Sequence, residues 1–256
     1  GSKKIAKELI DEAVLSDCDA VKIQSFIKGS RISNKIKSAN YAEKVIGLEE
    51  SLDETFDRLV LSFEDQKEIF DYARSKNILI FSTPFDFESV DFLEKMNVQL
   101  YKIASMDLVN LPLIKYIAKK QKPIILSTGM SSLGQIEEAI NTIKEEGNPN
   151  LAILHCNSSY PSSIKDMNLN LIPNLKKIFN IPVGLSDHTF GLFTSHTAMV
   201  LGANIVERHF TLNRTFEGPD HILSSEPKEF KELVSISKKI KDVLGSGVKK
   251  IMPSEY

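Results

Sequence analysis

The 256-residue sequence predicts an α/β fold, namely a (β/α)8 TIM barrel that lacks its first strand. Short apolar runs alternate with helical patterns along the chain. The runs are apolar on both faces, which is typical of parallel strands covered by helices in a barrel or a doubly wound sheet. Seven runs are present and the chain opens with a helix, so one preceding strand would complete eight. We therefore expect a single barrel domain over residues 1–256, cut at both ends.

The predicted elements follow one another at regular spacing. The strands are expected over residues 20–26, 78–82, 99–103, 123–127, 151–156, 182–185 and 203–208. The helices are expected over residues 3–13, 63–76, 87–95, 111–119, 133–145, 171–179, 194–201 and 227–244, where apolar residues recur at helical spacing. The polar stretch of residues 28–53 is expected to leave the barrel, with a short helix over residues 41–46.

Composition excludes several classes of partner. The net charge of −2 gives no bulk attraction to nucleic acid or to an anionic membrane. No apolar run approaches the roughly 20 residues of a membrane span, and no signal peptide is visible. With only two cysteines, Cys18 and Cys156, we expect a reduced, cytoplasmic protein.

Two histidines follow neighbouring predicted strands. His188 in LSDHT comes after the strand that ends near residue 185, and His209 in VERHF follows the next strand. Parallel strands would deliver both imidazoles to the same end of the sheet, and imidazole is a common ligand of Mn, Fe and Zn. Asp187 and Glu207 lie beside them. A single histidine at a strand end is usually structural, so the residues alone leave a metal site and a structural role open.

Polar residues gather at the carboxyl ends of the predicted strands, where barrel enzymes carry their chemistry. Lys22 and Lys102 lie inside apolar runs, where an unpaired charge is costly to bury. We therefore favour an anion site over two lysines that merely reach solvent. His155 is expected to be a core residue rather than a ligand. The ring also contains Gln24, Thr83, Ser105, Ser127, Thr128, Asn157, Ser158, Tyr160 and Ser186, with Arg214, Glu217, Asp220 and His221 in the loop after the last strand.

Eight motifs occur in order, one for each strand or the loop that follows it: VKIQ, FSTPFD, YKIASMD, ILSTGM, LHCNSSYP, GLSDHT, VERHFTL and GPDH. This set resembles the sialic acid synthase family, which includes N-acetylneuraminate and legionaminate synthases. The resemblance covers nearly the whole chain. It implies a transferase that condenses phosphoenolpyruvate with an N-acetylated hexosamine.

The resemblance also implies roles for individual residues. His188 and His209 would hold a divalent metal, most often Mn2+, with Mg2+ or Co2+ as alternatives. Tyr160 and Asp220 would face the sugar or a water molecule on the metal, and Glu207 would be an acidic neighbour of the metal site. The residues that would bind phosphoenolpyruvate are Lys22, Thr83, Lys102, Ser105, Ser127, Asn157 and Ser186.

Two departures from the family pattern concern the ends of the chain. The family carries an acidic residue on its first strand, and the present chain begins just after that point. Family members also work as domain-swapped homodimers, in which a C-terminal antifreeze-like domain supplies an arginine to the partner subunit. We therefore expect residues 1–256 alone to be poorly stable or associated, and inactive.

The implied reaction is metal-assisted attack on the open-chain aldehyde of the sugar. C3 of phosphoenolpyruvate attacks, water adds at C2, and phosphate leaves by carbon–oxygen cleavage. The sugar would be N-acetylmannosamine or a 2,4-diacetamido-6-deoxy sugar, and the segment FDFESVDFL is closer to the sialic and legionaminic branches than to the pseudaminic one. The alternatives are a Schiff-base aldolase that uses Lys102 or Lys22, and an inactive barrel fragment that binds ligand.

Overall fold

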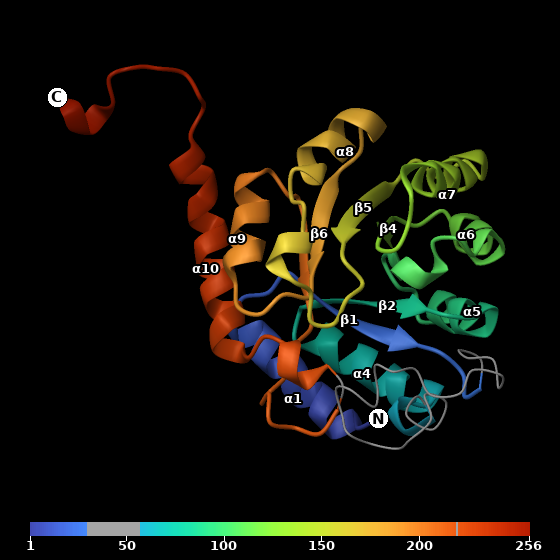
Figure 1. Ribbon diagram of the computed structural model, residues 1–256. Coiled ribbons are helices and arrows are strands. Elements are labelled where there is room, and N and C mark those ends of the chain that lie inside the picture. The colour runs from blue at the N-terminus through green and yellow to red at the C-terminus, as the bar shows by residue number, and fades with distance from the viewer. Residues whose placement is uncertain (30–56, 219) are drawn as a thin grey trace.

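The structure is a computed structural model that describes residues 1–29, 57–218 and 220–256. Within them, one parallel sheet carries its strands in chain order: β1 (Ala20–Ser25), β2 (Leu79–Pro84), β3 (Tyr101–Ile103), β4 (Ile124–Ser127), β5 (Leu151–Cys156), β6 (Val183–Asp187) and β7 (Val206–Arg208). Figure 1 shows helices on the outside of this sheet. They are α1 (Lys3–Leu15), α4 (Phe63–Ser75), α5 (Phe87–Lys95), α6 (Leu111–Ala118), α7 (Leu133–Glu145), α8 (Leu171–Phe179), α9 (Phe193–Val200) and α10 (Pro227–Leu244).

The helices form because each carries an apolar face and a local start signal. In α7, Ser132 and Gln135 make a reciprocal capping box at the first turn. Ile136, Ile140 and Ile143 then follow at helical spacing and are buried. They join one core cluster with the outward side chains of the strands. Burial of these side chains against the sheet fixes the helices on its outer face.

The sheet curls so that its two edge strands in the described residues approach each other. Lys22 on β1 forms an ion pair with Glu207 on β7, with 3.2 Å between Nζ and Oε2. The outer layer also meets there, because Ser16, after α1, donates to the carbonyl of Pro227 in α10 at 3.2 Å. The curl therefore encloses an interior into which both edge strands send side chains.

The register decides which side chains face this interior. Cys156 pairs with Ser186, and Ser186 pairs with Glu207, so all three lie on the same face of the sheet. The same alternation places Lys102 and Ser127 inside, since Lys102 pairs with Ile125 two residues earlier on β4. The opposite, outward face of the sheet packs on the helices, and Leu185 and Ile153 on that face are fully buried.

The predicted strands and helices are confirmed, with boundaries shifted by a few residues. β3 begins at Tyr101 and β7 at Val206, later than expected. A parallel sheet curled into part of a barrel is confirmed, and no closing eighth strand lies among the described residues. The short helix expected over residues 41–46 lies outside them. In the described parts of the chain, no helix has the length and apolar character of a membrane span.

Candidate active site

Two lysines and one carboxylate form the charged centre of the interior. Glu207 accepts from Ser186 at 3.1 Å and lies 3.2 Å from Lys22 and 3.7 Å from Lys102. Lys102 is 2% exposed and donates to Ser127 at 2.6 Å. The sequence predicted these five residues for the site, and the structure brings them together from five different strands.

Burial and mutual charge shift the protonation equilibria of this centre. Burial lowers the pKa of Lys102 to about 8, although the charge of Glu207 opposes the shift. Burial alone would raise the pKa of Glu207, but the charges of Lys102 and Lys22 outweigh it and lower that pKa to about 2. The carboxylate is therefore ionised at neutral pH and holds both ammonium groups in the interior.

A small cradle lies beside the lysines, at the turn after β4. The amide of Gly129 donates to Ser105 Oγ at 2.9 Å. A Cβ on Gly129 would stand 2.2 Å from Ser158 Oγ, so only glycine leaves this space open. Ser158 Oγ is buried and has no hydrogen-bond partner in the structure. An unpaired buried hydroxyl is costly, and an anion seated in the cradle would satisfy it.

Three aromatic rings, those of Tyr160, His188 and His209, lie close together at the carboxyl ends of the strands. The rings of His188 and His209 lie 5.2 Å apart between centroids. Tyr160 packs 4.1 Å from His188 and 5.8 Å from His209. The predicted convergence of the two histidines is therefore found. Asp220 also lies here, with Oδ2 3.5 Å from Nδ1 of His209.

The histidine pair fits a metal in its protonation and tautomer. Nδ1 of His188 lies 2.8 Å from the carbonyl oxygen of Asn157, which can only accept, so Nδ1 carries the hydrogen and Nε2 keeps its lone pair. Burial lowers the pKa of His188 to about 4, and burial also lowers the pKa of His209. Metal-bound histidines commonly donate their other nitrogen to a carbonyl in this way. Among the described residues, no cluster of three or more His, Cys, Asp or Glu side chains that could hold a metal is found.

The two acids beside the histidines differ in orientation. Glu207 faces the interior, as described above, whereas Asp187 is fully buried on the outer face and pairs with Arg208. Asp187 therefore does not support the metal site as a ligand. The position of Asp187 next to His188 in the sequence was misleading, because alternate residues of a strand point to opposite faces.

Other predicted residues take more distant or structural places. Thr83 is buried, and it pairs with Gln24 two residues beyond Lys22 on the same face of β1. The side-chain oxygen of Asn157 accepts from the amide of Ser159 at 2.9 Å, which shapes the turn. Arg214 donates to the carbonyl of Ser224 at 2.9 Å and pairs with Glu229, so it braces its own loop.

His155 is a core residue, as the sequence predicted. It lies on the outer face of β5, is 8% exposed, and has Nε2 2.6 Å from the carbonyl oxygen of Met167. Cys156 is a site residue that the sequence prediction omitted, and Ser158 was placed in the polar ring but given no binding role. Cys156 points inward, with Sγ 3.9 Å from Nδ1 of His188, and burial raises its thiol pKa. The LHCNSSYP segment contains both residues, but only the register shows their directions.

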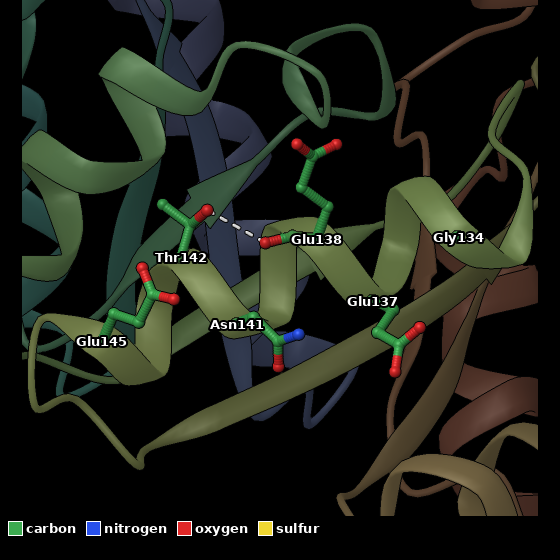
Figure 2. A pocket seen from close by; sticks show the side chains of 6 residues that line it. All are labelled: Gly134, Glu137, Glu138, Asn141, Thr142 and Glu145. Atoms are coloured by element: carbon green, nitrogen blue, oxygen red, sulfur yellow. Dashed lines mark hydrogen bonds between the residues drawn. The ribbon is translucent and has the colours of Figure 1, made fainter.

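Two hollows lie on the surface of the described residues, and the second is also lined by Cys156. The first, of about 400 Å³, is lined by residues of α7, most of them with acidic or amide side chains. Figure 2 shows these side chains on the helix. Thr142 there donates to the carbonyl of Glu138 one turn earlier at 2.9 Å. A second, of about 410 Å³, lies between α7 and α8 and includes Met130 and His155. Neither contains the lysines or the histidine pair.

The fold and these side chains define a class of protein: a parallel α/β barrel-type protein with two lysines paired to an interior carboxylate, beside a pair of imidazoles at the carboxyl ends of its strands. Residues 9–249 match the NeuB family, and the chain belongs to this family of sialic acid synthases. The match runs over residues 9–249 and so does not depend on one motif.

Relatives and solved structures agree with the family assignment. The chain is 43% identical over 257 residues to the N,N'-diacetyllegionaminic acid synthase of Campylobacter jejuni, covering all of this chain and 77% of that protein. It is 36% identical over 247 residues to the pseudaminic acid synthase of the same organism, covering 96% of this chain and 72% of that protein. The crystal structure of N-acetylneuraminic acid synthetase from Leptospira borgpetersenii superposes with a TM-score of 0.86 at 33% identity, covering 99% and 84% of the two chains.

Proposed function

We propose that the protein condenses phosphoenolpyruvate with an N-acetylated amino sugar to give a nine-carbon 2-keto acid and phosphate. One observation carries the proposal: Lys22, Lys102 and the Gly129 cradle lie on the same interior surface as the pair of neutral histidines. Lysines and hydroxyls suit the phosphate and carboxylate of a small anion. The histidine pair suits a metal that would polarise the aldehyde of the sugar.

The chain's own residues act mainly by positioning. Lys22 and Lys102 bind phosphoenolpyruvate, with Ser127, Ser186 and the cradle hydroxyls as directed donors. Glu207 keeps the ammonium groups in place before the substrate arrives. Tyr160 covers the histidine pair and faces the sugar. Holding two reactants in register supplies much of the rate gain in a reaction of this type.

His188 and His209 would hold a divalent metal, with Mn2+ as our first choice and Mg2+ or Co2+ as alternatives. An ion held there would supply Lewis-acid polarisation of the sugar aldehyde. Asp220 lies close enough to His209 to orient that ring. The carboxylate of Asp220 and the two imidazole rings together line the part of the site that would bind the sugar.

For the sugar we favour the 2,4-diacetamido-6-deoxy acceptor that gives a legionaminic-type product. Identity to the named legionaminic acid synthase is 43%, against 36% to the pseudaminic acid synthase. N-acetylmannosamine is the second choice.

A Schiff-base aldolase is the second candidate function, because burial lowers the pKa of Lys102 to about 8. A lysine in that range is a better nucleophile at neutral pH. The ion pair with Glu207 opposes this use, since it favours the charged ammonium. Borohydride trapping in the presence of pyruvate separates the two functions, since only an imine leaves a label on lysine.

Because residues 1–256 alone are expected to be inactive, the test uses a chain that also carries the first strand and the C-terminal domain that the family resemblance implies. Turnover of this longer chain is measured with the sugars of the three branches in parallel, by phosphate release and by mass spectrometry of the product. We expect Mn2+-dependent product with phosphoenolpyruvate and the legionaminic-type sugar. His209→Ala should lose turnover by at least 10–100-fold, the usual effect of weaker changes around a metal. His196→Ala, on outer helix α9, is the matched control and should keep it. Full activity of His209→Ala, or borohydride labelling of Lys102, would refute the proposal.

A further inference from the structure

A buried polar network lies directly behind the histidine pair. Asp187 on β6 and Arg208 on β7 are paired in the sheet register, and their side chains are 0% and 1% exposed. Each precedes one of the two histidines in the chain. Because the side chains alternate, the ion pair points to the helix layer while the two imidazoles point inward.

Each polar atom of this pair has a protein partner. Arg208 donates from Nε to Ser225 Oγ at 2.8 Å and from Nη2 to the carbonyl of Thr189 at 2.7 Å. Asp187 Oδ1 accepts from the amide of Thr189 at 2.9 Å, and Oδ2 accepts from Ser195 Oγ of α9 at 2.6 Å. The network therefore joins β6, β7, α9 and the loop that carries Ser225.

The bonds of the network end on the backbone beside each histidine. Thr189, which follows His188, is held through both its amide and its carbonyl. The amide of Ser225 donates to the carbonyl of His209 at 2.8 Å, and Arg208 holds the side chain of that same serine. An apolar pair at this place would fill space equally well but would fix neither backbone segment.

We propose that the Asp187–Arg208 pair, with Ser195, is a positioning device that sets the separation and orientation of His188 and His209. The inference rests on the proposed function for its consequence in catalysis. The structural part of the inference concerns only the separation and orientation of the two imidazoles. These three residues touch no substrate and act through the histidines.

Two variants test the proposal. Arg208→Lys keeps the charge and the partner Asp187, but a single ammonium nitrogen cannot reach Ser225 and Thr189 together. The triple change Asp187→Leu, Ser195→Ala and Arg208→Met replaces the network by apolar side chains, which buried ion pairs often tolerate. The matched control is Glu94→Leu with Lys122→Met, which removes a pair of 2.8 Å at the opposite end of the sheet.

The first readout is the imidazole nitrogen NMR spectrum of the metal-free protein. We expect one tautomer for His188 in the wild type and the control, with hydrogen on Nδ1. In both network variants we expect exchange-broadened or doubled signals from the two histidines, at unchanged far-UV circular dichroism. Wild-type histidine spectra in both folded variants would overturn the proposal. This readout needs neither metal nor substrate.

The second readout separates positioning from folding. We expect Mn2+ affinity and kcat to fall at least tenfold in both variants. KM for phosphoenolpyruvate should change less than threefold, because Lys22 and Lys102 lie on other strands and are held by Glu207. Wild-type affinity and kcat in the variants contradict the proposal. If the wild type itself shows neither Mn2+ binding nor turnover, the proposed function fails, and the NMR result still decides the positioning role.

Discussion

At the scale of single residues, the site works through charges that are already paired before substrate arrives. Glu207 neutralises part of the charge of the buried Lys102 and the partly buried Lys22, which stabilises both side chains in the interior. We expect an anionic substrate to bind against the one net positive charge that remains. The lysines are expected to act on phosphoenolpyruvate and not on the sugar.

Lys102→Ala should therefore raise KM for phosphoenolpyruvate by about 10–100-fold, since a hydrogen bond to a charged group contributes about 1.5–3 kcal/mol. KM for the sugar should change little. Steady-state kinetics with each substrate varied in turn measure both values. Lys115→Ala, an exposed residue of α6 paired with Glu146, is the control. A variant impaired only toward the sugar would show that the two binding sites are reversed.

Gly129→Ala should close the cradle. The added Cβ would stand 2.2 Å from Ser158 Oγ and 2.9 Å from Ser105 Oγ, so at least one hydroxyl must move out of the anion site. We expect phosphoenolpyruvate affinity, measured by calorimetry, to fall about tenfold or more, the loss of one good hydrogen bond to a charged group. Gly134→Ala, where a Cβ meets nothing within 4 Å, should leave affinity unchanged. Equal affinity in the two variants would remove the cradle from the anion site.

At this scale the sequence predicts which residues belong to the site better than it predicts where their side chains point. His188, His209 and the two lysines could be selected because each lies at or within an apolar strand. The outward turn of Asp187 and the unpaired hydroxyl of Ser158 depend on register and on neighbouring strands. Those contacts come from residues distant in the sequence, and a local pattern does not encode them.

At the scale of elements, strand spacing near the histidines depends on a close approach. Gly184 on β6 has no room for a side chain, because a Cβ would lie 2.3 Å from the carbonyl oxygen of Ile205 and 2.7 Å from Leu154. Leu185 then donates to that same carbonyl at 2.8 Å. The small residue lets β6 and the start of β7 meet.

Gly184→Ala is expected to destabilise the fold by about 1–3 kcal/mol, the usual range for overpacking a filled core. Urea unfolding followed by circular dichroism measures the change. Gly134→Ala serves again as the control and should lose no stability, because it lies in the first turn of α7 with free space. Unchanged stability of the Gly184 variant would mean that β6 and β7 can separate at no cost.

Strands and helices were predictable because their signals are local. Capping residues, apolar spacing and turns occur within a few residues, as in α7 with Ser132 and Gln135. Boundaries were less predictable, and β7 is shorter than its apolar run. Pairing with a neighbouring strand, rather than the run itself, decides where a strand begins.

At the scale of the whole molecule, the curl of the sheet makes the site. It brings Lys22 on the first described strand to Glu207 on the last, 185 positions later in the chain. The βα rhythm predicts parallel strands, but it does not by itself distinguish a barrel from an open doubly wound sheet. The count of seven strands, which one preceding strand would bring to eight, favoured the barrel, and the parallel curled sheet agrees with that prediction.

The central claim is that this interior condenses phosphoenolpyruvate by cleaving its carbon–oxygen bond. The most direct measurement uses phosphoenolpyruvate with 18O at the bridging oxygen, the amino sugar and Mn2+. We predict that phosphorus NMR will find the label in the released phosphate. Recovery of the label in the nine-carbon product would place the cleavage at the phosphorus–oxygen bond and contradict the account.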